Sequence, residues 1–157
     1  MTIIAARTED ARAAVVQFIA DRTGSTPQEL VGDMPFEALC TFRAGRPMGA
    51  LLYSNHRGHS IELSAAGRPG WLTPGVVREI FRYPFEQLGC YNVLSFVKRS
   101  NSASRELCKR LGYQQPCMIR TGGRRADDMI LYVMSRPSCR WLIDEKRSKN
   151  ARPLRTL

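Results

Sequence analysis

Arginine is the side chain in this sequence with the most evident chemistry, which is the binding of anions. Of the 24 basic residues, 20 are arginine, against 14 acidic residues. A guanidinium group can hold a phosphate or a carboxylate through two parallel hydrogen bonds. The basic excess lies in residues 105–126 and 136–157. Three partners stay open: the phosphates of a cofactor, a nucleic acid or an acidic protein. A basic surface that binds none of them is the fourth interpretation.

A second anion-binding feature is a glycine-containing turn before a helix, AGRPGWLT at residues 66–73. Free amides and the dipole at a helix N-terminus favour an anion. Pro69 and Pro74 have no amide hydrogen, which reduces the number of donors. The remaining donors are Gly70, Trp71, Leu72, Thr73 and Gly75, with Arg68 as a charged clamp. The same turn could instead only lead the chain into the helix, without a ligand.

The histidines and cysteines lack the spacing of a metal site. His56 and His59 could titrate near neutral pH, but two histidines in a turn are commonly surface residues. The five cysteines are scattered and include no C-x-x-C pair. We therefore expect reduced, mostly buried thiols and no metal ion.

Two predicted helices would position the anion-binding groups. Residues 74–88 carry apolar side chains at helical spacing, and this helix should begin at the N-cap Thr73 and stop at Gly89. Pro74 suits the first helical position, where an amide hydrogen has no intrahelical acceptor.

The second helix is predicted from NSASRELCKRLGY, residues 101–113. Asn101 can cap its start, and Gly112 lies where a left-handed C-terminal cap is needed. Strands predicted at residues 59–65 and 91–97 precede the two helices. This order indicates a parallel strand pair joined by a right-handed crossover.

The remaining segments read as further strands and one more long helix. An amphipathic helix is predicted at residues 8–22, followed by a short helical turn at 27–30. Gly45 and Gly58 mark the turns of an antiparallel meander, and the end of the chain reads as a hairpin. The strands are expected at residues 2–6, 37–43, 47–55, 59–65, 113–120 and 128–134.

These elements predict an α/β (α+β) fold. A chain of 157 residues suits one domain, with a mixed, mostly antiparallel sheet, a central parallel pair and flanking helices. We assign residues 1–142 to this domain and 143–157 to a basic C-terminal tail. Trp71, Tyr83 and Tyr91 are expected to be packing residues. No apolar segment is long enough to cross a bilayer and no signal peptide is evident, so we expect a cytoplasmic protein, or one carried in a particle.

The order of elements, with Asn101, Ser104 and the Leu-Gly-Tyr at residues 111–113, resembles the GNAT superfamily of acyl-CoA-dependent N-acyltransferases. The resemblance covers nearly the whole chain. It implies acetyl-CoA as the cofactor and an amine as the acceptor. The segment MSRPSCRWL, residues 134–142, also resembles small GNAT-like proteins encoded by tailed bacteriophages.

The resemblance implies a cofactor site. In the family, the pantetheine arm pairs with the exposed backbone edge of the strand at residues 61–65, here Leu63 and Ala65. The pyrophosphate is held by the following turn, here Arg68 and residues 70–73. This turn departs from the family spacing of Arg or Gln, two residues, Gly, one residue, then Gly or Ala. Asn101 and Ser104 match positions that touch the cofactor, although capping alone also explains Asn101.

The resemblance also implies two catalytic roles. Glu62 lies on the strand that faces the reacting centre, where it, or a water that it orients, could take the proton of the amine. It could instead face solvent or pair with an arginine. Cys108 stands where many members have a tyrosine that protonates the departing thiolate. Its thiol could donate weakly, or it could be a buried core residue.

Three hypotheses follow. The first is an acetyl-CoA-dependent N-acetyltransferase that acts by direct transfer to an unknown amine. The second is a catalytically inactive GNAT-fold binding or structural protein, such as a bacteriophage virion component, with other virion proteins as partners. The third, a nucleic-acid binder, ranks last because the sequence lacks interleaved aromatic residues and a helix-turn-helix pattern.

Overall fold

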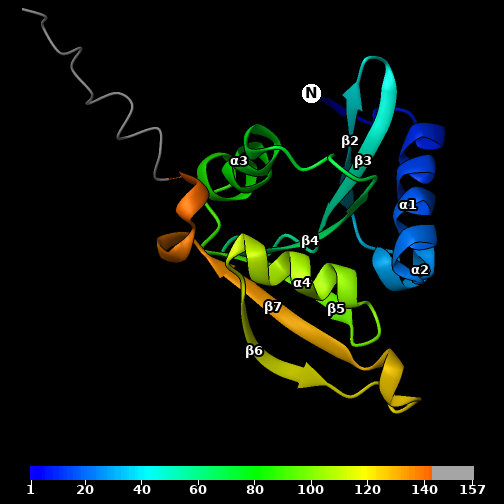
Figure 1. Cartoon of the computed structure of the whole chain (residues 1–157), viewed down its shortest axis with the longest axis vertical. Helices are drawn as coiled ribbons and strands as arrows, with labels where there is room; N and C mark the ends of the chain where they lie inside the picture. Colours follow the sequence, from blue (N-terminus) through cyan, green and yellow to red (C-terminus); the bar gives the residue numbers. More distant parts are fainter. Residues whose placement is uncertain (143–157) are drawn as a thin grey trace, which may run out of the picture.

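A computed structural model of the chain describes residues 1–142. One sheet of seven strands has the order β1-β2-β3-β4-β5-β7-β6 (Figure 1). Neighbouring strands are antiparallel except β4 and β5, which are parallel, so the predicted fold class is confirmed. The strands are β1 (Thr2–Ala5), β2 (Phe36–Arg43), β3 (Arg46–Ser54), β4 (Ser60–Gly67), β5 (Asn92–Lys98), β6 (Gln114–Ile119) and β7 (Met129–Ser135).

Side-chain caps set the helix boundaries, at Thr73 and Asn101 as predicted and also at Thr8. The helices are α1 (Glu9–Thr23), α2 (Pro27–Leu30), α3 (Pro74–Arg82) and α4 (Ser102–Leu111). The side chains of Thr8, Thr73 and Asn101 accept hydrogen bonds from backbone amides in the first turns of α1, α3 and α4, respectively. Gly112 ends α4 in the left-handed conformation, at φ 97°. Short 3₁₀ turns follow at residues 125–127, 136–138 and 140–142.

The helix predicted at residues 74–88 changes type at Tyr83, one residue before Pro84. It is α-helical to Arg82 and continues as a π-helix over Tyr83–Gln87. Pro84 has no amide hydrogen to donate to the carbonyl of Ile80, four residues before it. The buried Tyr53 hydroxyl donates to that carbonyl instead, at 2.8 Å. A side chain of β3 therefore replaces the lost helical bond and fixes α3 to the sheet.

The sheet separates two apolar clusters. One contains the inner face of α3, Cys108 of α4 and inward residues of β3, β4, β5 and β7. The other lies between α1 and β2–β3. Figure 1 shows α1 and α3 on opposite sides of β2 and β3. We call the α3 and α4 side the first face and the α1 side the second face.

Trp71 packs directly on backbone. Its side chain is buried, at 6% exposure, against the paired residues Gly49 of β3 and Gly67 of β4. A Cβ atom at Gly67 would lie 2.3 Å from the indole Cγ, and one at Gly49 would lie 2.2 Å from Cε3. Two glycines are therefore needed so that the indole can hold the turn after β4 against the sheet.

The expectation that three aromatic residues pack was wrong for one of them. Trp71 is buried and Tyr83 is half-buried, but Tyr91 is 55% exposed because it lies in the connection just before β5. The predicted tail, residues 143–157, lies outside the described residues. Within residues 1–142, no helix has the length and apolar character needed to cross a membrane.

Gly67→Ala should lower the free energy of unfolding by about 1–3 kcal/mol, because the new methyl group overlaps a buried indole. Urea denaturation would measure the change. Gly75→Ala is the matched control, since a Cβ there meets no atom within 4 Å, and it should not destabilise the protein. An equal loss in both variants would contradict the packing role of Gly67.

Candidate functional site

The site is built where β4 and β5 separate. Their parallel pairing covers Ser60 to Glu62 on β4 and ends at the pair Glu62 and Leu94. At the next step the Ser95 hydroxyl donates to the Leu63 carbonyl at 2.8 Å. A side chain thus takes the place of the next backbone bond, and the strands diverge beyond it.

Beyond Leu63, alternate backbone groups of β4 face the gap. The carbonyl of Leu63 points toward β5, whereas the amide of Arg68 points toward β3 and donates to Met48 at 2.7 Å. Because successive residues of a strand direct their backbone groups to opposite sides, those of Ala65 and Gly67 face the gap. The strand therefore presents free donors and acceptors to an extended chain.

A narrow slot opens through this gap into a larger cavity. The slot has a volume of about 80 Å³, and Leu63, Ser95 and Cys108 are part of its lining. The larger cavity, about 840 Å³, extends over the turn after β4 and the start of α4. Residues that line both are Thr23, Ala65, Asn101, Ser104, Leu107 and Leu111. The arrangement suits a long, thin ligand with one bulky end.

The turn after β4 lines the larger cavity with Arg68, Gly70, Trp71 and Leu72. The amides of Trp71 and Thr73 donate inside the turn, to the carbonyls of Arg68 and Trp71. Among the described residues, the amides of Gly70 and Leu72 have no acceptor. Two of the predicted donors are therefore engaged within the turn and two face no competing carbonyl.

Thr73 lies apart from this cavity. Its hydroxyl caps α3 by accepting from the Val76 amide at 3.3 Å, and the residue lines a different cavity, beside β1 and α3. The turn itself is held from outside, because the Arg43 guanidinium of β2 donates to the Gly70 carbonyl at 2.9 Å. The turn is thus held at Gly70 and at Thr73 by the protein itself.

Sequence reasoning missed three groups of the larger cavity. Arg22 from the end of α1, Arg110 from α4 and Trp141 line it beside Arg68. The Trp141 indole donates to the Leu111 carbonyl at 2.9 Å, which fixes the ring against the end of α4. The basic excess noted at residues 105–126 includes Arg110, but only the tertiary fold brings the three residues together in one cavity.

Asn101 and Ser104 lie together at the start of α4. The Asn101 side chain accepts a hydrogen bond from the Ser104 amide at 3.1 Å, so the capping interpretation of Asn101 is confirmed. Both residues also line the slot and the larger cavity. Capping occupies the side-chain oxygen of Asn101, and the Ser104 hydroxyl remains available to a ligand.

Glu62 lies just outside the slot lining, on the same face of β4 as Ser64, which does line it. Its carboxylate accepts a hydrogen bond from the Asn55 amide at 2.6 Å. The Arg57 guanidinium in turn donates to the Asn55 carbonyl oxygen at 3.1 Å. Glu62 is half-buried and is held by a neutral partner, not by an arginine.

Cys108 faces the slot beside Tyr113. Burial raises the pKa of the Cys108 thiol to about 12 and raises the pKa of Tyr113 well above its ordinary value. The hydroxyl oxygens of Tyr113 and Ser95 are 3.5 Å apart. The slot is therefore lined with groups that keep their protons at neutral pH. Ser95, a single polar residue in the apolar run YNVLSFV, was a signal that sequence reasoning did not use.

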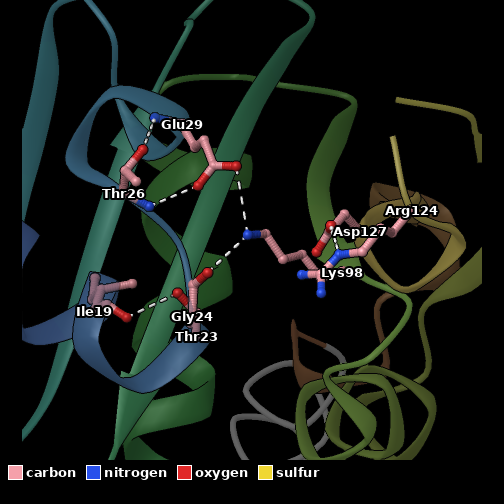
Figure 2. A network of polar contacts seen from close by, with 8 residues as sticks. All are labelled: Ile19, Thr23, Gly24, Thr26, Glu29, Lys98, Arg124 and Asp127. Atoms are coloured by element: carbon pink, nitrogen blue, oxygen red, sulfur yellow. Dashed lines mark hydrogen bonds and ion pairs between the residues drawn. The ribbon is translucent and has the colours of Figure 1, made fainter. Parts of the chain in front are cut away.

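The connection between α1 and α2 forms part of the slot wall, and one lysine holds it in place. Figure 2 shows Lys98, at the end of β5, reaching the Gly24 carbonyl and the Glu29 carboxylate. These contacts measure 2.7 Å and 3.5 Å. Glu29 also accepts the Thr26 amide at 2.7 Å, and that bond lowers the pKa of Glu29. The connection between α1 and α2 is thus attached to β5.

No protein-family model and no curated protein matches the sequence, but solved structures match the fold. The chain resembles a variant of spermidine N-acetyltransferase from Vibrio cholerae, with a TM-score of 0.66 and 13% identity over 92% of this chain and 99% of that one. A GNAT-family protein from Desulfovibrio desulfuricans gives a TM-score of 0.61 and 16% identity, over 85% and 98% of the two chains. The fold is that of the GNAT acetyltransferases.

A third GNAT-fold match is a Salmonella typhimurium protein whose structure contains its cofactor acetyl-CoA. It gives a TM-score of 0.58 and 16% identity over 86% of this chain and 93% of that one. Identities this low show a shared fold and leave the substrate of this chain to its own site residues.

Cys108 should be far less reactive toward iodoacetamide at pH 8 than an ordinary thiol. A pKa of about 12 leaves roughly a thousandth of the thiolate that a thiol of pKa about 8.5 would have. Peptide mapping by mass spectrometry would measure the rates, with the exposed Cys117 as internal control. Equal alkylation of both residues would show that Cys108 is not held as described.

Proposed function

We propose that this protein is an N-acetyltransferase that moves the acetyl group of acetyl-CoA to an amine. The observation that carries the proposal is the separation of β4 and β5 after Glu62, which leaves backbone groups of Ala65 facing the slot and those of Gly67 facing the larger cavity. The slot continues into a large basic cavity. The fold shared with acetyltransferases supports the same proposal.

The lining residues fit acetyl-CoA in three parts. The free edge at Ala65 and Gly67 suits the two amides of the pantetheine arm, which bind as an added strand does. The predicted contact at the Leu63 carbonyl is already taken by the Ser95 hydroxyl. The amides of Gly70 and Leu72 suit the pyrophosphate, with Arg68, Arg22 and Arg110 nearby to balance its charge. The Ser104 hydroxyl and the Trp141 ring add a donor and an apolar surface.

Acetyl transfer requires two proton transfers: one away from the amine and one to the departing sulfur. The cofactor supplies the acetyl group as a thioester, and the amine nitrogen forms the new bond to its carbonyl carbon as the carbon–sulfur bond breaks. Glu62, or a water that it orients, takes the proton that the amine loses. Asn55 holds the carboxylate in place. The Cys108 thiol keeps its proton at neutral pH, so we assign it as a hydrogen-bond donor toward the departing sulfur, which is finally protonated from solvent.

The inactive-scaffold hypothesis remains the alternative. The two prolines of the turn and the internal bonds of the Trp71 and Thr73 amides favour it, because they reduce the donors left for a pyrophosphate. The relationship to bacteriophage proteins, including a place in a virion, stays a prediction. The same holds for the cytoplasmic location. Binding of acetyl-CoA separates the two hypotheses.

In a calorimetric titration, wild-type protein should bind acetyl-CoA with a micromolar Kd, which corresponds to a binding free energy of about 8 kcal/mol. Glu62→Gln should bind it equally well, because the residue lies outside the slot lining, yet should transfer acetyl groups about 100-fold more slowly. Steady-state assay with a simple primary amine would measure turnover.

The matched control is Glu37→Gln, which removes an exposed carboxylate from β2. It should leave both binding and turnover unchanged. No heat with acetyl-CoA at millimolar concentration would reject the proposed function in favour of the scaffold. Normal binding with unchanged turnover in Glu62→Gln would remove Glu62 from its role.

A further inference from the structure

The centre of the second face of the sheet is apolar where no described helix covers it, and Asn92, Ser135 and Lys98 lie at its ends. Half of the sheet, formed by β5, β7 and β6, presents side chains on this face that belong to neither apolar cluster. We call this surface the apolar floor. Its residues are Leu94 and Phe96 of β5, Met129, Leu131 and Val133 of β7, and Ile119 of β6. An antiparallel sheet with one solvated face ordinarily carries polar residues there.

The strand register connects the apolar floor to the candidate site. Glu62 pairs with Leu94, and Leu94 pairs with Val133, so the three side chains form one row across the sheet. Phe96 and Leu131 form the next row. Phe96 also lines the slot, and it is 38% exposed. The floor therefore begins at the proposed base and at the mouth of the slot.

The charges beside the floor do not suit an acceptor with several positive charges. Three carboxylates around it are already paired with cations: Glu29 with Lys98 at 3.5 Å, Asp127 with Arg124 at 3.2 Å and Asp128 with Arg120 at 2.9 Å. Of the described carboxylates on the floor's own rows, Glu62 is the one held by a neutral partner. An acceptor that carries a single amine followed by apolar groups therefore matches this surface.

We infer that the acceptor is the N-terminal α-amino group of a polypeptide, whose first residues lie extended across the apolar floor. This inference rests on the proposed function and names its substrate class. From β4 to β6 there are three interstrand spacings of about 4.8 Å, or about 14 Å in total. About four extended residues cover that distance, at roughly 3.3 Å each.

The chemistry of an α-amino group fits a carboxylate base. Its ordinary pKa of about 8 is more than two units below that of a lysine side chain, so more of it is neutral at pH 7. The neutral nitrogen bonds to the acetyl carbon and the thioester carbon–sulfur bond breaks. Its extra proton passes to Glu62 or to the water that Glu62 orients, and the sulfur gains a proton from solvent. The products are an N-acetylated chain and free coenzyme A.

The test is transfer from acetyl-CoA to four acceptors: alaninamide, Ala-Leu-amide, Ala-Leu-Phe-Gly-amide and spermidine. For the full-length wild-type protein, kcat/KM should rise at least 10-fold from alaninamide to the tetrapeptide amide. Spermidine should not exceed alaninamide. Leu131→Ser should reduce the tetrapeptide value about 10-fold and leave the alaninamide value and the acetyl-CoA binding heat unchanged.

The matched control is Met118→Ser. Met118 is 44% exposed on β6, and it points to the opposite face because it pairs with the buried Ile130. This variant should change none of the values. If Leu131→Ser does not fold, Val133→Thr, which keeps the side-chain shape, should lower the tetrapeptide value in the same way.

The outcomes separate the two proposals. Normal acetyl-CoA binding with equal kcat/KM along the peptide series, or with spermidine preferred, would overturn this inference alone. A dimer in sedimentation that Leu131→Ser converts to a monomer, with unchanged peptide kinetics, would also overturn it, since the floor would then be a contact between copies. Absent acetyl-CoA binding and absent transfer to every acceptor would overturn the proposed function and this inference together.

Discussion

The site depends on the short pairing between β4 and β5. A parallel pair needs a crossover helix, and α3 supplies it, but the pairing ends at Glu62 and Leu94. The Ser95 hydroxyl then satisfies the Leu63 carbonyl, so the strands can separate without leaving that buried acceptor unpaired. The free backbone edge, the slot and the exposed start of α4 all follow from this separation.

Two contacts far apart in sequence hold the separated strands open. On one side, Trp71 packs on the backbone of Gly49 and Gly67 and fixes the turn after β4. On the other, Lys98 joins the end of β5 to the α1–α2 connection. Neither contact uses a group assigned to chemistry. The opening is therefore part of the folded structure, which lowers the cost of ordering the protein when a ligand binds.

The sequence predicted most of the fold because its signals are local. Thr73, Asn101 and Gly112 carry capping chemistry, and the element order implies the crossover. The π-helical turn was missed because the Tyr53 hydroxyl that compensates for Pro84 comes from another strand. Arg22, Arg110 and Trp141 were missed because tertiary contacts alone place them in one cavity. The apolar floor was missed because its residues alternate like any half-buried strand, and whether a helix covers that face is decided elsewhere in the chain.

Amide hydrogen exchange of individual residues of β4, followed by NMR with and without saturating acetyl-CoA, tests the central claim most directly. The amides of Ser64 and Ala66 point toward β3 and should exchange at the same rate in both states. The amide of Ala65 faces the gap and should become strongly protected when the cofactor pairs with it. An Ala65 amide that exchanges equally fast with and without acetyl-CoA would contradict the assignment of the free β4 edge as the cofactor site.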